Sequence, residues 1–256
     1  MNEANQISQQ TKLYGFIGEE AGKSSLSATM NRLFKANNKD AMTIPMNIRE
    51  DDFYFTLSNM KKSHVNGAII SNEYVRQVVE LLDESSEAVK QSGMCDILVR
   101  KEQMLKGDIF STKVFIEFLK SNNVKEIALL GTTPHAKAFS FLSREHNFNI
   151  SYFNDDLENL MNFTQEMQIQ NPDINRISSN MCINFSPFDA VIDFSEMTNF
   201  EMVEQFSKLN LDMKQKTQFS PLKKITKELG AFYTSYDDLL VELAKGAADF
   251  FDKELI

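Results

Sequence analysis

Strand-like and helix-like segments alternate over the first 71 residues, and this alternation constrains the fold more than any other feature of the sequence. Three short apolar runs are interleaved with two segments whose apolar residues recur at helical spacing, at 13–17, 26–34, 41–48, 51–61 and 67–71. Strands that alternate with helices form a parallel sheet with helices packed on its faces. The pattern therefore predicts an α/β fold that begins with a β-α-β-α-β unit.

The segment 107–143 reads as helix, strand, tight turn and helix, and it marks the passage from a first lobe to a second. Its apolar run at 125–130 is typical of a central parallel strand. Before this segment we predict helices at 74–83 and 86–92 and strands at 95–100 and 103–107. After it we predict strands at 149–153, 181–185 and 189–194, a loop at 171–180, and final helices from about 220 and 236.

The charge balance excludes two classes of partner. A net charge of −9 and a pI near 5.0 repel nucleic acid and anionic membranes, and no cluster of Lys and Arg reverses the sign locally. The chain has no apolar run of 18 residues, and its polar start lacks a stretch of signal-peptide length. We predict a cytoplasmic protein for which a small polar ligand is possible and whose oligomeric state is open.

The cysteine and histidine residues fit no metal site. Cys95 and Cys182 lie far apart in strand-like apolar runs, and we interpret both as small buried residues rather than a disulfide or a metal pair. His64, His135 and His146 form no HxxxH pair, and the chain has no CxxC. No metal is therefore predicted.

The string Gly-Lys-Ser at 22–24 is similar to the end of a P-loop but lacks its essential features. A P-loop needs a glycine five positions before Gly22, where this chain has Ile17. Glu19 and Glu20 would also put two negative charges where phosphate oxygens bind. We interpret the string as a small-ligand loop before a helix, with a plain solvated turn as the alternative.

The turn at Gly131-Thr132-Thr133-Pro134-His135 stands where a dinucleotide-binding domain holds pyrophosphate. No two of the nine glycines are separated by a single residue, so the dinucleotide fingerprint is absent. Thr133 fills space that the diphosphate needs, and Pro134 removes an N–H donor. Phosphate contact through the two threonine hydroxyls, the remaining amides, His135 or Lys137 stays open beside a purely connecting role.

Two acidic pairs, Asp155-Asp156 and Asp237-Asp238, stand at predicted helix starts. Carboxylates at a helix start accept hydrogen bonds from unpaired amides and interact favourably with the helix dipole. We therefore interpret both pairs as helix caps. A Ser-His-Asp triad stays open, although no GxSxG elbow supports it.

Several local strings, taken in order, resemble the shikimate dehydrogenase family. They run nearly the whole length of the chain: Tyr14 to Gly18 with Ser24 and Asn31, Asp51-Asp52-Phe53, Gly67, Leu81 to Glu84, Gly93, Leu105-Lys106-Gly107, Ser220 to Lys223, Gly230-Ala231, and Asp237 with Leu239 to Ala247. The resemblance implies a substrate lobe made of 1–106 and 220–256. It also implies a Rossmann-like NAD(P)-type lobe, 107–219, with a cleft between the two lobes.

The resemblance further implies that 3-dehydroshikimate is reduced by a Lys–Asp pair, and this chain departs from that pattern. The family's lysine falls on Val75 and its aspartate on Ser111. Valine offers no proton, and serine has no useful pKa near neutrality. The substrate-binding positions implied by the resemblance are Ser24, Ser71, Asp96, Ser111 and Lys245.

In the second lobe, the family's glycine-rich nucleotide loop falls on 131–135 and keeps one glycine of three. The cofactor-binding positions implied there are Gly131, Thr132, Thr133 and His135. The arginine expected to hold the 2′-phosphate of NADP falls in the string Phe153-Asn154-Asp155, where an acid suits NAD better.

These departures lead to two hypotheses. The first is a shikimate dehydrogenase-like pseudoenzyme, inactive on shikimate, that uses no cofactor and is retained to bind a small ligand, a nucleotide or a protein partner. The second is an active oxidoreductase that reduces 3-dehydroshikimate or a related keto acid with NADP or NAD. Its polar residues would be Lys23, Ser71, Arg76, Asp96, Ser111 and Lys245.

Overall fold

The computed structural model describes residues 11–214 and 218–254, and the chain forms two compact units. Unit 1 lies within 1–111 and 240–256, and unit 2 spans 112–239. The boundaries predicted from sequence, after 106 and 219, differ from these. Residues 220–239 belong to unit 2 because the helix Pro221–Glu228 packs against the last strand of that unit's sheet.

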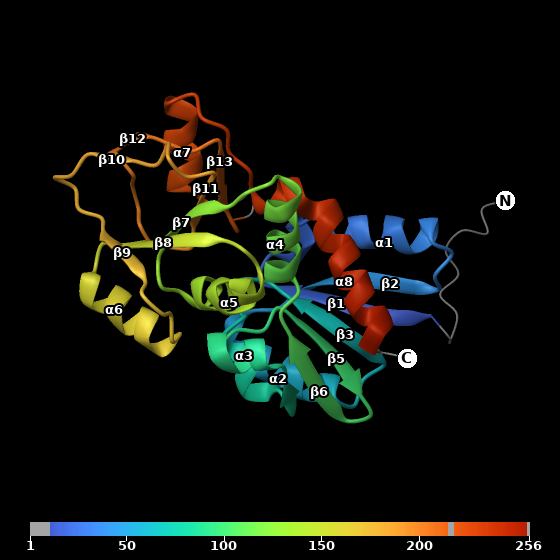
Figure 1. Ribbon diagram of the computed structural model, residues 1–256. Helices are drawn as coiled ribbons and strands as arrows, with labels where there is room; N and C mark the ends of the chain where they lie inside the picture. Colours follow the sequence, from blue (N-terminus) through green and yellow to red (C-terminus); the bar gives the residue numbers. More distant parts are fainter. Residues whose placement is uncertain (1–10, 215–217, 255–256) are drawn as a thin grey trace. The chain divides into compact units, whose positions relative to one another are not determined.

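Unit 1 is built on a six-stranded sheet with the order β2-β1-β3-β5-β6-β4 (Figure 1). Its strands are β1 (Lys12–Gly18), β2 (Ala41–Asn47), β3 (Val65–Ile70), β4 (Glu84–Ser85), β5 (Ile97–Lys101) and β6 (Met104–Asp108). The first three strands are parallel, as the β-α-β-α-β pattern predicts, and β5 and β6 continue the sheet as an antiparallel pair. Pro45 lies in the edge strand β2, where a missing N–H is tolerated.

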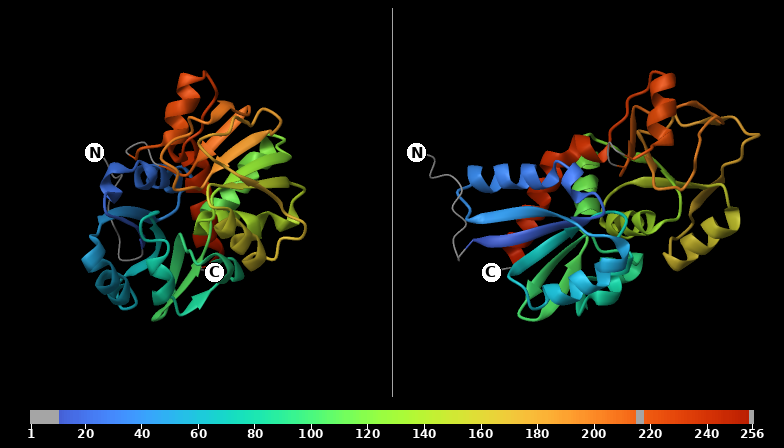
Figure 2. Two further views of the ribbon diagram at one scale, coloured as in Figure 1. Left: turned by 90° about the vertical axis from the view of Figure 1, so that its left-hand side faces the viewer. Right: turned by 180° about the vertical axis from the view of Figure 1, so that it is seen from behind.

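Four helices cover this sheet, α1 (Leu26–Ala36), α2 (Glu50–Met60), α3 (Glu87–Ser92) and α8 (Leu240–Glu254). Helices α1 and α8 pack on each other over one face, and α2 and α3 lie on the other face (Figures 1 and 2). Aromatic rings fill both interfaces. Tyr14 stacks on Phe251 of α8, with ring centroids 4.0 Å apart, and Phe53 of α2 stacks on Tyr74 at 4.3 Å.

Unit 2 contains a five-stranded parallel sheet with the order β13-β11-β7-β8-β9. Its strands are β7 (Glu126–Leu130), β8 (Asn149–Asn154), β9 (Asp173–Arg176), β11 (Ala190–Asp193) and β13 (Leu209–Asp212). Helices α4 (Ser111–Ser121), α5 (Pro134–Leu142) and α6 (Leu157–Glu166) belong to its first half, and α7 (Pro221–Glu228) follows β13. The strand order reverses at β7, which gives this Rossmann-like sheet its topological switch point.

The second half of unit 2 has no crossover helix between β9 and β13. Irregular chain covers the sheet there, pinned by the short parallel pair β10 (Ile183–Asn184) and β12 (Val203–Gln205). Phenylalanine rings take the place of the missing helices. Phe185 contacts Phe153, Phe188 and Phe206, with centroids 5.2–6.2 Å apart.

The sequence-based strands and helices of the first 71 residues are confirmed, and several later elements differ. The helix predicted at 74–83 is a series of turns with a 3₁₀-helix at Gln77–Leu81. The loop predicted at 171–180 contains β9, and β12 and β13 were not predicted. These strands are only three or four residues long, too short for a periodicity to stand out.

Gly67 of β3 gives a direct test of packing in unit 1. A Cβ built on Gly67 would lie 2.6 Å from the backbone oxygen of Leu98 and 2.9 Å from the ring of Phe251. The variant Gly67→Ala should lower the free energy of unfolding by about 1–3 kcal/mol, measured by urea denaturation. Gly22→Ala is the matched control, because its Cβ meets nothing closer than 3.4 Å, and it should stay within about 0.5 kcal/mol of wild type. Equal stabilities for the two variants would contradict this packing.

Candidate functional site

Asp96 and Ser111, two of the predicted substrate-binding residues, are brought into direct contact in unit 1. Asp96 precedes β5 and is 3% exposed, and Ser111 begins α4. The Asp96 carboxylate accepts hydrogen bonds from the backbone N–H of Phe110 at 2.7 Å and of Ser111 at 3.1 Å. It also accepts one from the Ser111 hydroxyl. The carboxylate therefore closes the turn between β6 and α4.

Burial sets the protonation of this carboxyl group. Burial raises the pKa of Asp96 to about 6, and the hydrogen bonds from Ser111 and Phe110 oppose that rise because they stabilise the charged form. A carboxyl group that titrates near neutrality can exchange a proton at physiological pH.

Ser71 lies at the carboxyl end of β3 beside Glu73, which the sequence analysis did not select. The Ser71 hydroxyl donates to the Glu73 carboxylate at 2.5 Å, and the backbone N–H of Glu19 donates to the same carboxylate at 2.8 Å. A Cβ on Gly18 would lie 2.8 Å from a Glu73 oxygen, so glycine leaves the room for this side chain. The Glu73 carboxylate therefore links the residues that follow β1 to Ser71 at the end of β3.

The neighbouring tyrosine shows that this corner is negatively charged. Tyr74 donates its hydroxyl to the backbone oxygen of Ile48 at 2.7 Å. Burial raises the pKa of Tyr74 to about 12, with further contributions from the charges of Glu19, Glu73 and Glu50. Three carboxylates therefore act on the carboxyl ends of β1 and β3.

Ser24 and Lys245 lie apart from these contacts. Ser24 Oγ accepts from the backbone N–H of Leu26 at 3.2 Å, and Lys245 is exposed on α8. Within the described residues, neither forms a hydrogen bond or ion pair with Asp96, Ser111 or Ser71. Their place in a ligand site stays a prediction.

The loop at 22–24 is held by local partners. The N–H of Gly22 donates to the side-chain oxygen of Asn47 at 2.8 Å, and the Lys23 ammonium pairs with Glu20. Gly22 and Lys23 fall in the 3₁₀-helix Ala21–Lys23, which follows β1. The string therefore does not form an open loop that could bind an anion. Ser25 precedes α1 as its N-terminal cap residue, but its side chain makes no capping hydrogen bond.

Val75, the position of the family's lysine, is a core residue. Its side chain is 3% exposed, and its backbone oxygen accepts from the N–H of Cys95 at 2.8 Å. Arg76, the next residue, is exposed at the start of the 3₁₀-helix Gln77–Leu81. A cation at position 75 would therefore be buried without compensation, whereas Arg76 faces solvent.

In unit 2, the predicted phosphate turn is fastened to the end of β11. Gly131 has φ +95°, and a Cβ there would lie 2.6 Å from the backbone of Phe194 and Ser195. The Thr133 hydroxyl donates to the Phe194 oxygen at 2.8 Å. Thr133 begins α5 with no side-chain cap, and Pro134 follows as its first residue. The retained glycine and the Thr133 hydroxyl therefore serve packing between β7 and β11.

Asp193 is a buried carboxyl group beside this turn that sequence analysis missed. It is 2% exposed and ends β11, and its carboxylate accepts from the backbone N–H of Ser195 at 2.9 Å and from the Ser195 hydroxyl at 2.6 Å. Burial raises its pKa to about 6, and the charge of Asp212 at the end of β13 adds to that rise. The sequence signal that could have identified Asp193 is an acidic residue at the end of an apolar strand, next to the point where the strand order reverses.

Two further sequence interpretations can be checked directly. Asp156 caps α6 by accepting from the Asn159 N–H at 3.1 Å, as predicted. The other pair lies inside the first turn of the 3₁₀-helix Tyr236–Leu239, where Asp238 accepts from the N–H and hydroxyl of Ser235 at 2.8 Å.

The cysteines are both free, but only one matches its predicted environment. Cys95 is buried, as predicted, whereas Cys182 is exposed, because the chain around it is irregular rather than a central strand. Across residues 11–214 and 218–254, no three His, Cys, Asp or Glu side chains gather as metal ligands. In the same residues, each helix is too short or too polar to cross a lipid bilayer.

Comparisons with known proteins were made with the sequence and with the fold. No family model matches the chain. The shikimate dehydrogenase (NADP(+)) of Dictyoglomus turgidum is 24% identical over 242 residues, which cover 93% of this chain and 84% of that protein. The shikimate dehydrogenase (NADP(+)) of Pyrococcus furiosus is 29% identical over 139 residues, about half of each chain.

The fold comparison gives the same relationship. The crystal structure of shikimate dehydrogenase from Aquifex aeolicus superposes with a TM-score of 0.74 at 18% identity, covering 97% of this chain and 95% of that one. The chain is a divergent shikimate dehydrogenase-like protein. The 5-ketofructose reductase of Gluconobacter sp. strain CHM43 also shares the fold, with a TM-score of 0.76 at 16% identity and coverage of 95% and 94%.

The resemblance and the α/β fold with parallel sheets are thus confirmed for this shikimate dehydrogenase-like protein. Its first unit collects all five predicted substrate-binding residues, and its second unit all four predicted cofactor-binding residues. Only Asp96 and Ser111 among the predicted substrate residues contact each other through side chains.

The raised pKa of Asp96 predicts a specific dependence of stability on pH. Its pKa in the folded chain, about 6, exceeds the usual value of 3.8, so the folded state holds the proton more tightly than the unfolded state. This contribution to the free energy of unfolding is complete below pH 4 and falls by about 3 kcal/mol as the pH rises through 6. Asp96→Asn cannot ionise and keeps one acceptor oxygen, but its amide nitrogen cannot accept the second backbone N–H, so the variant also carries a loss of stability that does not change with pH.

The measurement is urea denaturation of both proteins at several pH values between 4 and 7. The variant should gain stability relative to wild type as the pH rises. A difference that stays constant across this range would contradict the titration assigned to Asp96.

Proposed function

We propose that this shikimate dehydrogenase-like protein does not oxidise shikimate and is retained as a cytoplasmic binding protein for a small polar ligand. The observation that carries the proposal is Val75, a buried aliphatic side chain where the family places its catalytic lysine. Ser111 takes the place of the family's aspartate and donates its hydroxyl to Asp96. Without a cation and its carboxylate partner, hydride transfer to a ketone lacks a proton donor.

Three further observations support the absence of nucleotide-dependent turnover. The Thr133 hydroxyl is used by Phe194, and the Lys137 ammonium, one turn into α5, pairs with both oxygens of Glu166 at 2.7 Å. Pro134 provides no N–H at the start of that helix. The turn at 131–135 therefore has few groups left for a diphosphate.

The ligand that unit 1 suits best is neutral and rich in hydroxyl groups. Glu73 already occupies the Ser71 hydroxyl and the Glu19 amide, which are the donors that a ligand carboxylate would use. The carboxylates of Glu19, Glu50 and Glu73 make this corner negative, as their effect on Tyr74 indicates. A hydroxyl can donate to these acceptors, whereas a second carboxylate would be repelled.

A second candidate function is an active NAD(P)-dependent oxidoreductase that reduces 3-dehydroshikimate or a related keto acid. Asp96 favours it, because a buried carboxyl group with a pKa of about 6 matches the requirement for acid–base catalysis near neutrality. In that case Asp96 would supply the proton in place of the family's lysine.

Turnover separates the two functions. The wild-type protein, incubated with shikimate and either NADP or NAD, should reduce no cofactor above the buffer blank, as followed by absorbance of the nicotinamide. Enzyme-like turnover that Asp96→Asn abolishes would overturn the binding function and establish the second candidate. The control is thermal denaturation of Asp96→Asn beside the wild type, which shows that the variant is folded under the assay conditions, because it keeps only one of the two oxygens that accept from Phe110 and Ser111.

Ligand charge gives an independent prediction. Methyl shikimate has the hydroxyl groups of shikimate without its negative charge, so calorimetry should show tighter binding of the ester. Glu73→Gln keeps the size of the side chain and should reduce this preference by about 5- to 10-fold, the effect of one partly exposed charge. Tighter binding of shikimate than of its ester to the wild-type protein would contradict the assignment.

A further inference from the structure

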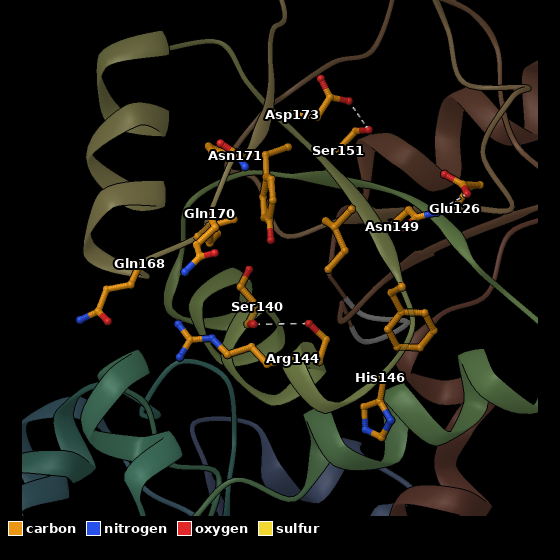
Figure 3. Close-up of a pocket in the computed structure, with 16 residues that line it drawn as sticks. Glu126, Ser140, Arg144, His146, Asn149, Ser151, Gln168, Gln170, Asn171 and Asp173 are labelled. Carbon is orange, nitrogen blue, oxygen red and sulfur yellow. Dashed lines mark hydrogen bonds between the residues drawn. The ribbon is translucent and has the colours of Figure 1, made fainter.

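A pocket of about 700 Å³ opens in unit 2 at the amino-terminal ends of β7, β8 and β9, away from the turn at 131–135 (Figure 3). It is lined by the end of α5 and the 3₁₀-helix Ser143–Glu145, by the first residues of β8, and by the loop 168–173 that leads into β9. In Rossmann-like sheets, cofactors bind at the opposite, carboxyl ends of the strands. This pocket is therefore separate from the site discussed above.

One end of the pocket carries a positive charge. The Arg144 guanidinium donates to the backbone oxygen of Met167 and lies over the Phe141 ring, 5.0 Å from its centroid. Among residues 11–214 and 218–254, Arg144 forms no ion pair with a carboxylate. The Met167 carbonyl and the Phe141 ring thus hold the guanidinium in position, but no carboxylate of these residues neutralises its charge.

Hydroxyl groups lie beside this arginine. Ser140 is 4% exposed, and its Oγ forms no hydrogen bond of regular geometry with a described residue. It lies next to the Tyr152 hydroxyl, whose pKa burial raises while Ser140 and Arg144 oppose that rise. Figure 3 shows Ser140 near Arg144 on the floor of the pocket, with Gln168 and Gln170 on the same side. This end offers a cation and neutral donors to an anionic group.

The other end of the pocket is acidic. Asp173 accepts from the hydroxyl of Ser151 at 2.5 Å and from the amide of Asn175 at 3.2 Å. Glu126 accepts from the amide of Asn149 at 2.7 Å. All three donors are neutral side chains, and Figure 3 shows both carboxylates on the side of the pocket away from Arg144.

Gln168 supports a ligand role for the loop. It ends α6 in the left-handed conformation with φ +50°, and the bonds Gln168 N–H to Gln165 and Ile169 N–H to Thr164 close the helix there. Glycine is the usual residue at such a C-terminal position, since it takes positive φ without strain. Glutamine at this place gives up local stability, and Gln168 is one of the residues that line the pocket.

We propose that this pocket binds a small metabolite with a carboxylate at one end and a hydrogen-bond-donating group, ammonium or hydroxyl, at the other. The carboxylate lies against Arg144 and Ser140, and the donor lies against Asp173 and Glu126. Ile150 and Tyr152 of β8 also line the pocket, and they would pack against the carbon skeleton of the ligand. A pure anion or a pure cation meets one charge of the wrong sign.

Four probes of one chain length test the proposal on the full-length protein by calorimetry. 6-Aminohexanoate carries both end groups, 6-hydroxyhexanoate replaces the ammonium by a hydroxyl, hexanoate lacks the donor, and hexylamine lacks the carboxylate. The first two should bind saturably and more tightly than the last two. The ratio between the first two tells whether the donor is an ammonium or a hydroxyl.

Variants locate the binding. Arg144→Gln should weaken binding of 6-aminohexanoate about 10- to 100-fold, the effect of one charge-assisted hydrogen bond. Asp173→Asn keeps the bond to Ser151 and should reduce the preference for 6-aminohexanoate over hexanoate. Arg32→Gln is the matched control, because Arg32 is an exposed arginine of unit 1 that bonds Thr29, and its affinity should equal that of wild type.

Gln168→Gly keeps the test informative if Arg144→Gln does not fold. Glycine relieves the positive φ at this position, so the variant should be as stable as wild type or more stable and yet bind 6-aminohexanoate more weakly. Failure of all four probes to bind, or unchanged binding in both Arg144→Gln and Gln168→Gly, would overturn the proposal. Neither result bears on shikimate turnover, which depends on unit 1 and on the turn at 131–135 rather than on this pocket.

Discussion

The buried carboxylate of Asp96 holds together the part of unit 1 on which the candidate site depends. It fixes the backbone N–H groups of Phe110 and Ser111 and so sets where α4 begins. The backbone oxygen of Asp96 accepts from Ile70 at the end of β3, which places Ser71 one residue beyond. A single acidic residue thus orders three strand ends, at the cost of keeping its proton up to near-neutral pH.

The first half of the chain could be predicted from its sequence because its local signals agree with each other. The strands β1, β2 and β3 are six or seven residues long, and Phe53, Leu57 and Met60 mark the buried stripe of α2. The α-helix predicted at 74–83 was wrong because Tyr74, Val75 and Val78 are buried at helical spacing in a tighter structure. The N–H of Val78 makes one α-type bond to Tyr74, and the bonds that follow are of the 3₁₀ type.

Only some of the polar residues of the candidate site could be predicted from the sequence. Asp96 and Ser111 were found through their positions in a family pattern, and their contact depends on the antiparallel pairing of β5 with β6, which brings residues 97 and 108 together. Glu73 and Asp193 were missed because their importance comes from contacts with Glu19 and Ser195 and from burial of the Asp193 carboxyl group. No periodicity or spacing in the sequence carries that information.

The strand order of unit 1 has a consequence for self-association. Its sheet ends on one side at β2, where Pro45 lacks the N–H that an added strand would need, and on the other at β4, which is only two residues long. Sheets with a proline or a very short strand at the border resist edge-to-edge growth into fibrils. Neither edge strand of this sheet is suited to pair with a strand of another molecule. The edge strands themselves therefore disfavour amyloid-like stacking of unit 1.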